Sequence, residues 1–143
     1  MKPSKTFLFL ILLVLSRSSL ALTSEQAWLA KSIYLECREK TICKTTDWQK
    51  IARVALNRQQ AYRVWKFGAR CSGIACIVQS KEYTSASLLK QPIKDKEVFE
   101  RIKKFVLQGQ FGTGKYLFFN TKGKGKNRKM VYRGNLMKLI GDK

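Results

Sequence analysis

Four cysteines, arranged as two close pairs, constrain the fold of this chain more than any other feature of its sequence. Cys37 lies close to Cys43, and Cys71 lies close to Cys76. In an oxidising compartment an even number of cysteines indicates disulfides, and short disulfide loops stabilise a small domain. Three pairings are possible, of which we favour the pairing within each close pair. A zinc site is the alternative, although neither pair has the CxxC spacing.

The amino-terminal segment predicts export, which is the condition that the disulfides require. Residues 1–5 are basic, and residues 7–15 form an apolar run that is too short to span a bilayer. Small residues follow at 19–21, as at a cleavage site. We therefore expect residues 1–21 to be a secretory signal peptide. Residues 22–143 would form a single periplasmic or secreted domain without a transmembrane segment.

The charge of the chain is strongly unbalanced. It has 29 lysines and arginines against 9 acidic residues, no histidine, and a formal net charge of +20. Such a charge on an exported domain predicts an anionic partner, such as wall polymer, lipid headgroups or nucleic acid. Nucleic acid is disfavoured, because the basic residues are spread along the chain and no nucleic-acid motif is present.

The absence of histidine excludes whole classes of enzyme. Ser-His-Asp and Cys-His hydrolases need an imidazole base, and common catalytic zinc sites use histidine ligands. Catalysis by carboxylates, or no catalysis at all, remains. We expect neither a metal nor a cofactor.

Hydrophobic periodicity predicts three main helices. A capping box of Thr23 and Gln26 begins the first, which should end near Glu39. The second is expected at 47–61, with the same capping signal starting at Thr46. The third is expected to begin after Asp95 and to end at Gly109.

The last third of the chain predicts a β-hairpin. Residues 116–120 and 130–132 are short β-prone runs, and residues 121–129 between them would form a long basic loop. Residues 73–79 fit either a short helix or a strand. The fold class is therefore α+β, with about three main helices and one short hairpin in a disulfide-stapled domain.

Glu36 is the acidic residue that best fits a catalytic role. It lies at the edge of the apolar stripe of the first helix, where a carboxylate can be half buried in a cleft wall. That setting favours the protonated form, which a general acid needs. The alternative is a boundary glutamate paired with Arg38 or a neighbouring lysine.

Five short segments, in order, resemble motifs of the bacterial cell wall hydrolases typified by the spore cortex-lytic enzyme SleB. Residues 33–38 (IYLECR) are similar to the family's I-Y-x-E-A-R, and residues 54–58 (VALNR) to its V-x-L-N-R. Residues 76–84 resemble its C-x-V and Q-F-S stretch, residues 116–120 (YLFFN) its L-Y-F-Y-N, and residues 140–142 its closing I-G-N/D.

The resemblance implies a small lysozyme-like domain that cleaves peptidoglycan glycan strands with Glu36 as the catalytic acid and base. In enzymes of the lytic transglycosylase type, one glutamate protonates the glycosidic oxygen and then takes a proton from the sugar's own 6-hydroxyl. The product carries a 1,6-anhydromuramoyl end. A muramidase-type hydrolysis would instead need a pair of carboxylates.

The same motifs nominate residues that would bind the substrate, namely Glu82, Tyr83, Thr84, Tyr116 and Asn120. Glu82 replaces the family's glutamine and is either a second carboxylate facing Glu36 or a solvated ion-pair partner. Tyr83 and Tyr116 are candidates for a sugar platform, although aromatic residues in such runs are often core. Asn120 could bind an acetamido group or cap the strand.

Two functions from different classes follow. The first is a peptidoglycan lytic transglycosylase that uses Glu36 and binds anionic wall polymers through its basic surface. The second is a non-catalytic cationic module that binds the cell wall or a membrane surface and does not need Glu36.

Overall fold

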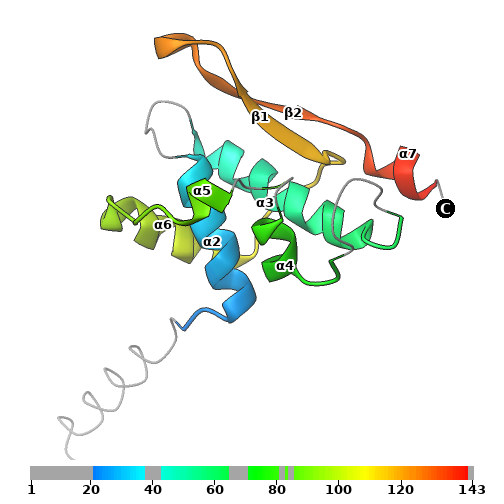
Figure 1. Ribbon diagram of the computed structural model, residues 1–143, viewed down its shortest axis with the longest axis horizontal. Helices are drawn as coiled ribbons and strands as arrows, with labels where there is room; N and C mark the ends of the chain where they lie inside the picture. The colour runs from blue at the N-terminus through cyan, green and yellow to red at the C-terminus, as the bar shows by residue number, and fades with distance from the viewer. Residues whose placement is uncertain (1–20, 38–42, 65–70, 81–82, 84–85, 142–143) are drawn as a thin grey trace, which may run out of the picture.

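The computed structural model describes residues 21–37, 43–64, 71–80, 83 and 86–141. These residues form a mixed α+β structure of six α-helices, one two-stranded antiparallel sheet and two disulfides (Figure 1). The signal peptide expected at 1–21 lies outside the described residues except for Ala21. The elements are α2 (Ser24–Glu36), α3 (Thr45–Gln60), α4 (Ile74–Gln79), α5 (Ala86–Leu89), α6 (Lys96–Gln108), β1 (Phe118–Lys122), β2 (Lys129–Arg133) and α7 (Leu136–Ile140), with a 3₁₀ turn at Gly125–Asn127.

Helix α2 is the centre of the core. Leu29, Ile33 and Leu35 are all buried, so the helix is covered by neighbouring elements on several sides. Its predicted capping box is confirmed: Thr23 Oγ1 accepts a hydrogen bond from the Gln26 backbone N–H, and the Gln26 side chain accepts one from the Thr23 N–H. The helix ends at Glu36, before the predicted end near Glu39.

Both disulfides follow the favoured pairing. Cys37 is bonded to Cys43, and Cys71 is bonded to Cys76. The first disulfide begins immediately after Glu36 and returns the chain to the start of α3, which explains why α2 ends early. The second joins Cys71, just before α4, to Cys76 within α4. Of the two structures that the sequence allows for residues 73–79, the helix is therefore the one observed.

Three further helix boundaries test the capping predictions. Helix α3 begins at Thr45, slightly earlier than expected. The reason is that Lys44 is its N-cap residue, and the Asp47 carboxylate accepts the Lys44 N–H at 2.8 Å. The predicted start of α6 is confirmed, since Asp95 Oδ1 accepts the Val98 N–H at 3.1 Å. Its end at Gly109 is also confirmed, at a φ of 68° that favours glycine.

A row of side chains on α3 holds the extended segment 110–116 along the helix. The donors recur every four residues, a rise of about 6 Å, and the acceptors recur every two residues of extended chain, which span a similar length. The three bonds join Gln49 Nε2 to Gln110 O at 3.4 Å, Arg53 Nη2 to Gly112 O at 2.6 Å, and Asn57 Nδ2 to Gly114 O at 2.9 Å. This matched spacing delivers the chain to the start of β1.

The hairpin is longer than the sequence predicted. Strands β1 and β2 pair from Phe118 with Arg133 to Lys122 with Lys129. The loop is therefore 123–128 rather than 121–129, because the backbone pairing continues past the apolar runs to Thr121 and Lys122 on β1 and to Lys129 on β2. The hairpin lies along one side of the helices, and its tip projects beyond them (Figure 1).

Candidate functional site

Glu36 is the last residue of α2 and is partly exposed, between the buried residues Leu35 and Cys37. Its charge raises the pKa of Tyr83, so the carboxylate and the phenol lie within electrostatic reach of one another. Ser32, one turn earlier on α2, is completely buried and hydrogen-bonds to the same phenol. Two of the predicted site residues, Glu36 and Tyr83, are therefore brought together.

Tyr83 is 5% exposed, and its hydroxyl donates a hydrogen bond to the Ile51 carbonyl at 2.8 Å. Burial raises the pKa of Tyr83 well above its ordinary value of 10.0; Arg58 opposes the shift and the Glu36 charge adds to it. The phenol therefore stays neutral at physiological pH. A ring this buried has no open face for stacking on a sugar, so Tyr83 supports the site from inside the core.

Arg58 joins Tyr83 to the hairpin. Its side chain is 5% exposed, and its Nε donates to the Leu117 carbonyl at 2.8 Å. The guanidinium carbon lies 5.3 Å from the centre of the Tyr83 ring and 5.2 Å from that of Phe118. The segment 54–58 was singled out by resemblance alone, and the structure assigns its asparagine and arginine to holding the chain that enters β1.

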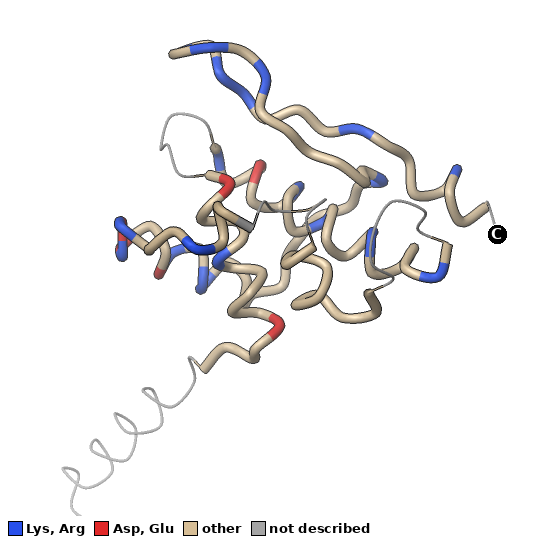
Figure 2. Tube along the Cα trace, in the orientation of Figure 1, with Lys and Arg blue, Asp and Glu red and all other residues tan. Residues whose placement is uncertain are grey.

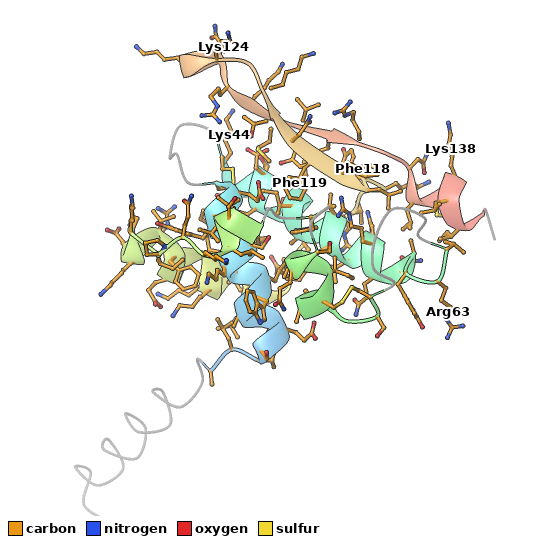
Figure 3. All side chains as sticks on the ribbon, viewed as in Figure 1. Lys44, Arg63, Phe118, Phe119, Lys124 and Lys138 are labelled. Carbon is orange, nitrogen blue, oxygen red and sulfur yellow. A yellow bond between two sulfur atoms is a disulfide. The ribbon has the colours of Figure 1, made fainter. Side chains whose placement is uncertain are left out.

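Aromatic side chains of the hairpin face the helices at this place. The rings of Phe119 and Tyr83 meet edge to face at 5.1 Å. On the paired position of β2, Tyr132 donates its hydroxyl hydrogen to Asp47 Oδ1 at 2.7 Å. Burial raises the pKa of Tyr132, and the hydrogen bond to Asp47 raises it further. Figure 3 shows Phe119 between the hairpin and α3.

Tyr116 and Asn120 lie at different parts of the hairpin. The Tyr116 ring is 5.5 Å from that of Tyr132 and is partly exposed, with Lys50 above both rings. Asn120 is exposed on β1 and lines a hollow beside Phe118. Tyr116 thus lies at the junction between hairpin and helices. Tyr116 and Tyr83 both raise the pKa of Tyr132, so Tyr132 is within electrostatic reach of each of them. Glu82 and Thr84 lie outside the described residues.

The charges are segregated in the molecule. Every described acidic residue lies on the helices or immediately beside them. The charged residues of the hairpin, in contrast, are all basic (Figure 2). No aspartate or glutamate occurs between residues 101 and 141. Lys124 and Lys126 near the tip are exposed, and Figure 3 shows Lys124 at the end of the hairpin that projects from the helical body. This basic hairpin is a second candidate surface.

The sequence did not reveal two residues of the site, Asp47 and Tyr132. Asp47 was interpreted only as part of a helix start, and Tyr132 only as strand. The available signal was the pairing of Tyr132 with Phe119, which becomes readable only once the register of the hairpin is known. A carboxylate at the first turn of α3 then has a phenol as its partner.

No cluster of three or more His, Cys, Asp or Glu side chains suitable for a metal ion occurs in the part of the chain that the structure describes. The helices of that part are too short or too polar to cross a membrane. No protein-family model, curated protein or solved structure matched the chain.

Proposed function

We propose that the protein cleaves peptidoglycan glycan strands, with Glu36 as the single general acid and base of a lytic transglycosylase. The observation that carries the proposal is the position of Glu36. It is a partly exposed carboxylate at the end of the central helix, within electrostatic reach of buried Tyr83, whose ring in turn meets Phe119 of the hairpin. Glycosidic cleavage requires an acid beside the bound sugar strand, and the proposal makes the hairpin the surface that binds this strand.

The chemistry needs one group that can give and then take a proton. The protonated Glu36 would donate to the glycosidic oxygen, which allows the poor alkoxide leaving group to depart with its bonding electrons. The resulting carboxylate would then remove the proton of the sugar's 6-hydroxyl as that oxygen closes on C1. No water is consumed, and the strand ends in a 1,6-anhydro ring.

The remaining described carboxylate nearby favours this route over hydrolysis with two carboxylates. Asp47 accepts hydrogen bonds from the Lys44 N–H and the Tyr132 hydroxyl. Both of its carboxylate oxygens are therefore engaged in structural hydrogen bonds. Glu82 is the residue that the sequence nominates as a second catalytic carboxylate. The single-carboxylate route also suits a chain without histidine.

The proposal includes a lysozyme-like arrangement, with a central helix ending in the acid and a hairpin forming the opposite wall of the cleft. Tyr83 and Arg58 would be positioning residues, because both are buried and contact the chain of the hairpin or its entry, and Tyr83 also interacts with Ser32 and Glu36 of α2. The cationic surface would retain the enzyme on anionic wall polymers. Two disulfides are compatible with its action in the periplasm or outside the cell.

The test is Glu36→Gln, which keeps the shape of the side chain and removes both proton-transfer roles. Turnover of purified peptidoglycan should fall by about 10²–10⁴-fold, the range for general acid catalysis. Glu97→Gln is the matched control, because Glu97 is an exposed glutamate in the first turn of α6. If Glu36→Gln retains the turnover of the Glu97→Gln control, Glu36 is not the catalytic acid.

A second candidate function is a cationic wall- or membrane-binding module, which the basic hairpin favours. Such a module would bind equally well with Glu36→Gln and would release nothing from peptidoglycan. Binding without any cleavage by the unaltered protein would make this the better account.

A further inference from the structure

A hollow of about 430 Å³ lies at the base of the hairpin, near the point where β2 leads towards α7. Its lining consists of Phe118, Phe119, Asn120, Arg133 and Gly134. Phe119 is the residue whose ring meets Tyr83, and Tyr83 is the residue that feels the charge of Glu36. Phe119 therefore joins the strand that lines the hollow to Tyr83, which is within electrostatic reach of the proposed catalytic residue.

The strand register gathers the polar and aromatic groups of this hollow. Phe118 pairs directly with Arg133 across the two strands, and Asn120 is two residues along β1 on the same face as Phe118. Gly134 adopts a φ of 90° that favours glycine. A Cβ there would lie 2.9 Å from Leu117 Cβ and 3.2 Å from Phe118 Cδ2, so a larger residue would displace the phenyl ring.

Phe118 is held in place and yet accessible. Its side chain is 38% exposed, which is unusual for a large apolar residue in this structure. The Arg58 guanidinium lies 5.2 Å from the ring centre and is itself fixed by the Leu117 carbonyl. A ring that is supported by a buried cation loses little freedom when a ligand covers it. Figure 3 shows Phe118 between α3 and α7, well away from Lys124 at the hairpin tip.

Arg133 supplies a positive charge that no acidic side chain pairs with in the part of the chain that the structure describes. It is exposed, and among the described residues its guanidinium has no carboxylate partner. Guanidinium groups bind carboxylates through two parallel hydrogen bonds, which gives orientation as well as attraction. An accessible aromatic ring, an amide and a free guanidinium around one hollow match the few convergent polar groups of a ligand site.

We propose that this hollow binds one N-acetylated sugar ring that carries a carboxylate. The inference rests on the proposed function and specifies which sugar of the strand is recognised. The apolar face of the pyranose would lie on Phe118, the acetamido group would hydrogen-bond with Asn120, and the carboxylate would pair with Arg133. The site would thus distinguish a glycan with acidic substituents from a neutral polymer of N-acetylglucosamine.

The experiment measures binding with Glu36→Gln protein, so that cleavage does not consume the ligands. Isothermal titration would use three soluble glycans: strands stripped of peptides, which expose the lactyl carboxylate; strands with stem peptides, which carry peptide carboxylates; and the neutral N-acetylglucosamine hexamer. At least one of the two acidic glycans, the one that carries the recognised carboxylate, should bind more tightly than the neutral hexamer. The tighter of the two identifies the source of that carboxylate.

Adding Arg133→Gln should weaken binding of the preferred acidic glycan by about tenfold and leave the neutral hexamer unchanged, since one charged hydrogen-bond group is lost. Arg63→Gln is the matched control, because it removes the same charge from an exposed arginine on the turn after α3. Phe118→Ala should weaken all three glycans, and Phe118→Leu replaces it if thermal unfolding shows that the alanine variant is not folded.

Three outcomes would overturn the proposal. Equal effects of Arg133→Gln and Arg63→Gln would show that binding depends on total charge and not on a site at Arg133. Equal affinities for acidic and neutral glycans would show that no carboxylate is recognised. If these failures occur while the unaltered protein still cleaves peptidoglycan, only the hollow loses its role. If Glu36→Gln binds no glycan and the unaltered protein cleaves none, the proposed function fails with it.

Discussion

The helical body and the hairpin are stabilised by different interactions. The body has an apolar core around α2 and two disulfides. The hairpin has mostly exposed strands and no cysteine, and only Met130, Phe119 and Tyr132 of its strands join that core. Its attachment also uses polar groups at one surface of α3: the row from Gln49 to Asn57, the Arg58 bond, and the Tyr132–Asp47 bond. The hairpin and the helical body can therefore be disturbed separately by different substitutions or conditions.

Reduction of the disulfides should have the largest effect at neutral pH, and it should act on the helical body. Each disulfide closes a short loop, for which the chain-entropy model gives about 2–3 kcal/mol of stabilisation. Together they are a large share of the stability of a small domain. Denaturant titration with and without reductant measures the difference. Four free thiols in the denatured, unreduced protein, or bound zinc, would contradict the assignment.

Alkaline pH should act on the interface between body and hairpin. Burial raises the pKa of both Tyr83 and Tyr132 above the ordinary value of 10.0. Below pH 10 both phenols are protonated in the folded and unfolded states, so they add no pH dependence. Above about pH 10 the unfolded state loses these protons first, and the free energy of unfolding should fall as pH rises.

The tyrosinate absorbance tests this directly during an alkaline titration. Two of the tyrosines should ionise only as the protein unfolds, and Tyr132→Phe should leave one such tyrosine. Complete ionisation of all tyrosines in a folded protein would contradict the burial of these two phenols.

Tyr132→Phe at neutral pH should loosen the hairpin while the body stays intact. The substitution removes the 2.7 Å hydrogen bond to Asp47, and such a bond to a charged group contributes about 1.5–3 kcal/mol. Hydrogen exchange should accelerate in β1 and β2 more than in α2. Tyr62→Phe is the control, because Tyr62 lies on the turn after α3 and its hydroxyl accepts only from Arg63 among the described contacts. Unchanged exchange in β1 and β2 would show that other contacts hold the hairpin.

Neutralising the basic segment 122–129 should have the smallest effect on folding, since these side chains are mostly exposed. Binding to anionic wall polymer should weaken at low salt and change little at high salt, because salt screens diffuse charge. The changes replace Lys122, Lys124, Lys126, Arg128 and Lys129 with glutamine. The control replaces five lysines of the helical body, Lys31, Lys90, Lys94, Lys96 and Lys104. If both variants lose the same affinity, total charge rather than the hairpin determines binding.

The sequence predicted the body better than its connection to the hairpin. Caps at Thr23 and Asp95 act within one turn of helix, so local sequence contains all of the signal. The disulfide pairing followed from short separations, although spacing alone left three pairings open. Residues 86–89 and 136–140 are helices too short to show a hydrophobic period, and the sequence does not predict them, although Asn135 caps the second by accepting the Met137 N–H.

The site was predictable only in part for a similar reason. Glu36 could be chosen from its place on one helix, but the burial of Tyr83 depends on Ile51 and Phe119, which belong to other elements. The role of Asp47 depends on Tyr132, far along the chain. Arg133 lines a hollow with Phe118 only because the strands pair in this register.

The most direct test of the central claim is mass spectrometry of purified peptidoglycan after digestion with the mature protein. The account predicts muropeptides with 1,6-anhydro ends from the unaltered protein and from Glu97→Gln, and almost none from Glu36→Gln. New reducing ends would instead indicate hydrolysis and a second carboxylate. Anhydro products from Glu36→Gln at the rate of the control, or no products from any of the three proteins, would contradict the assignment of Glu36 as the catalytic acid.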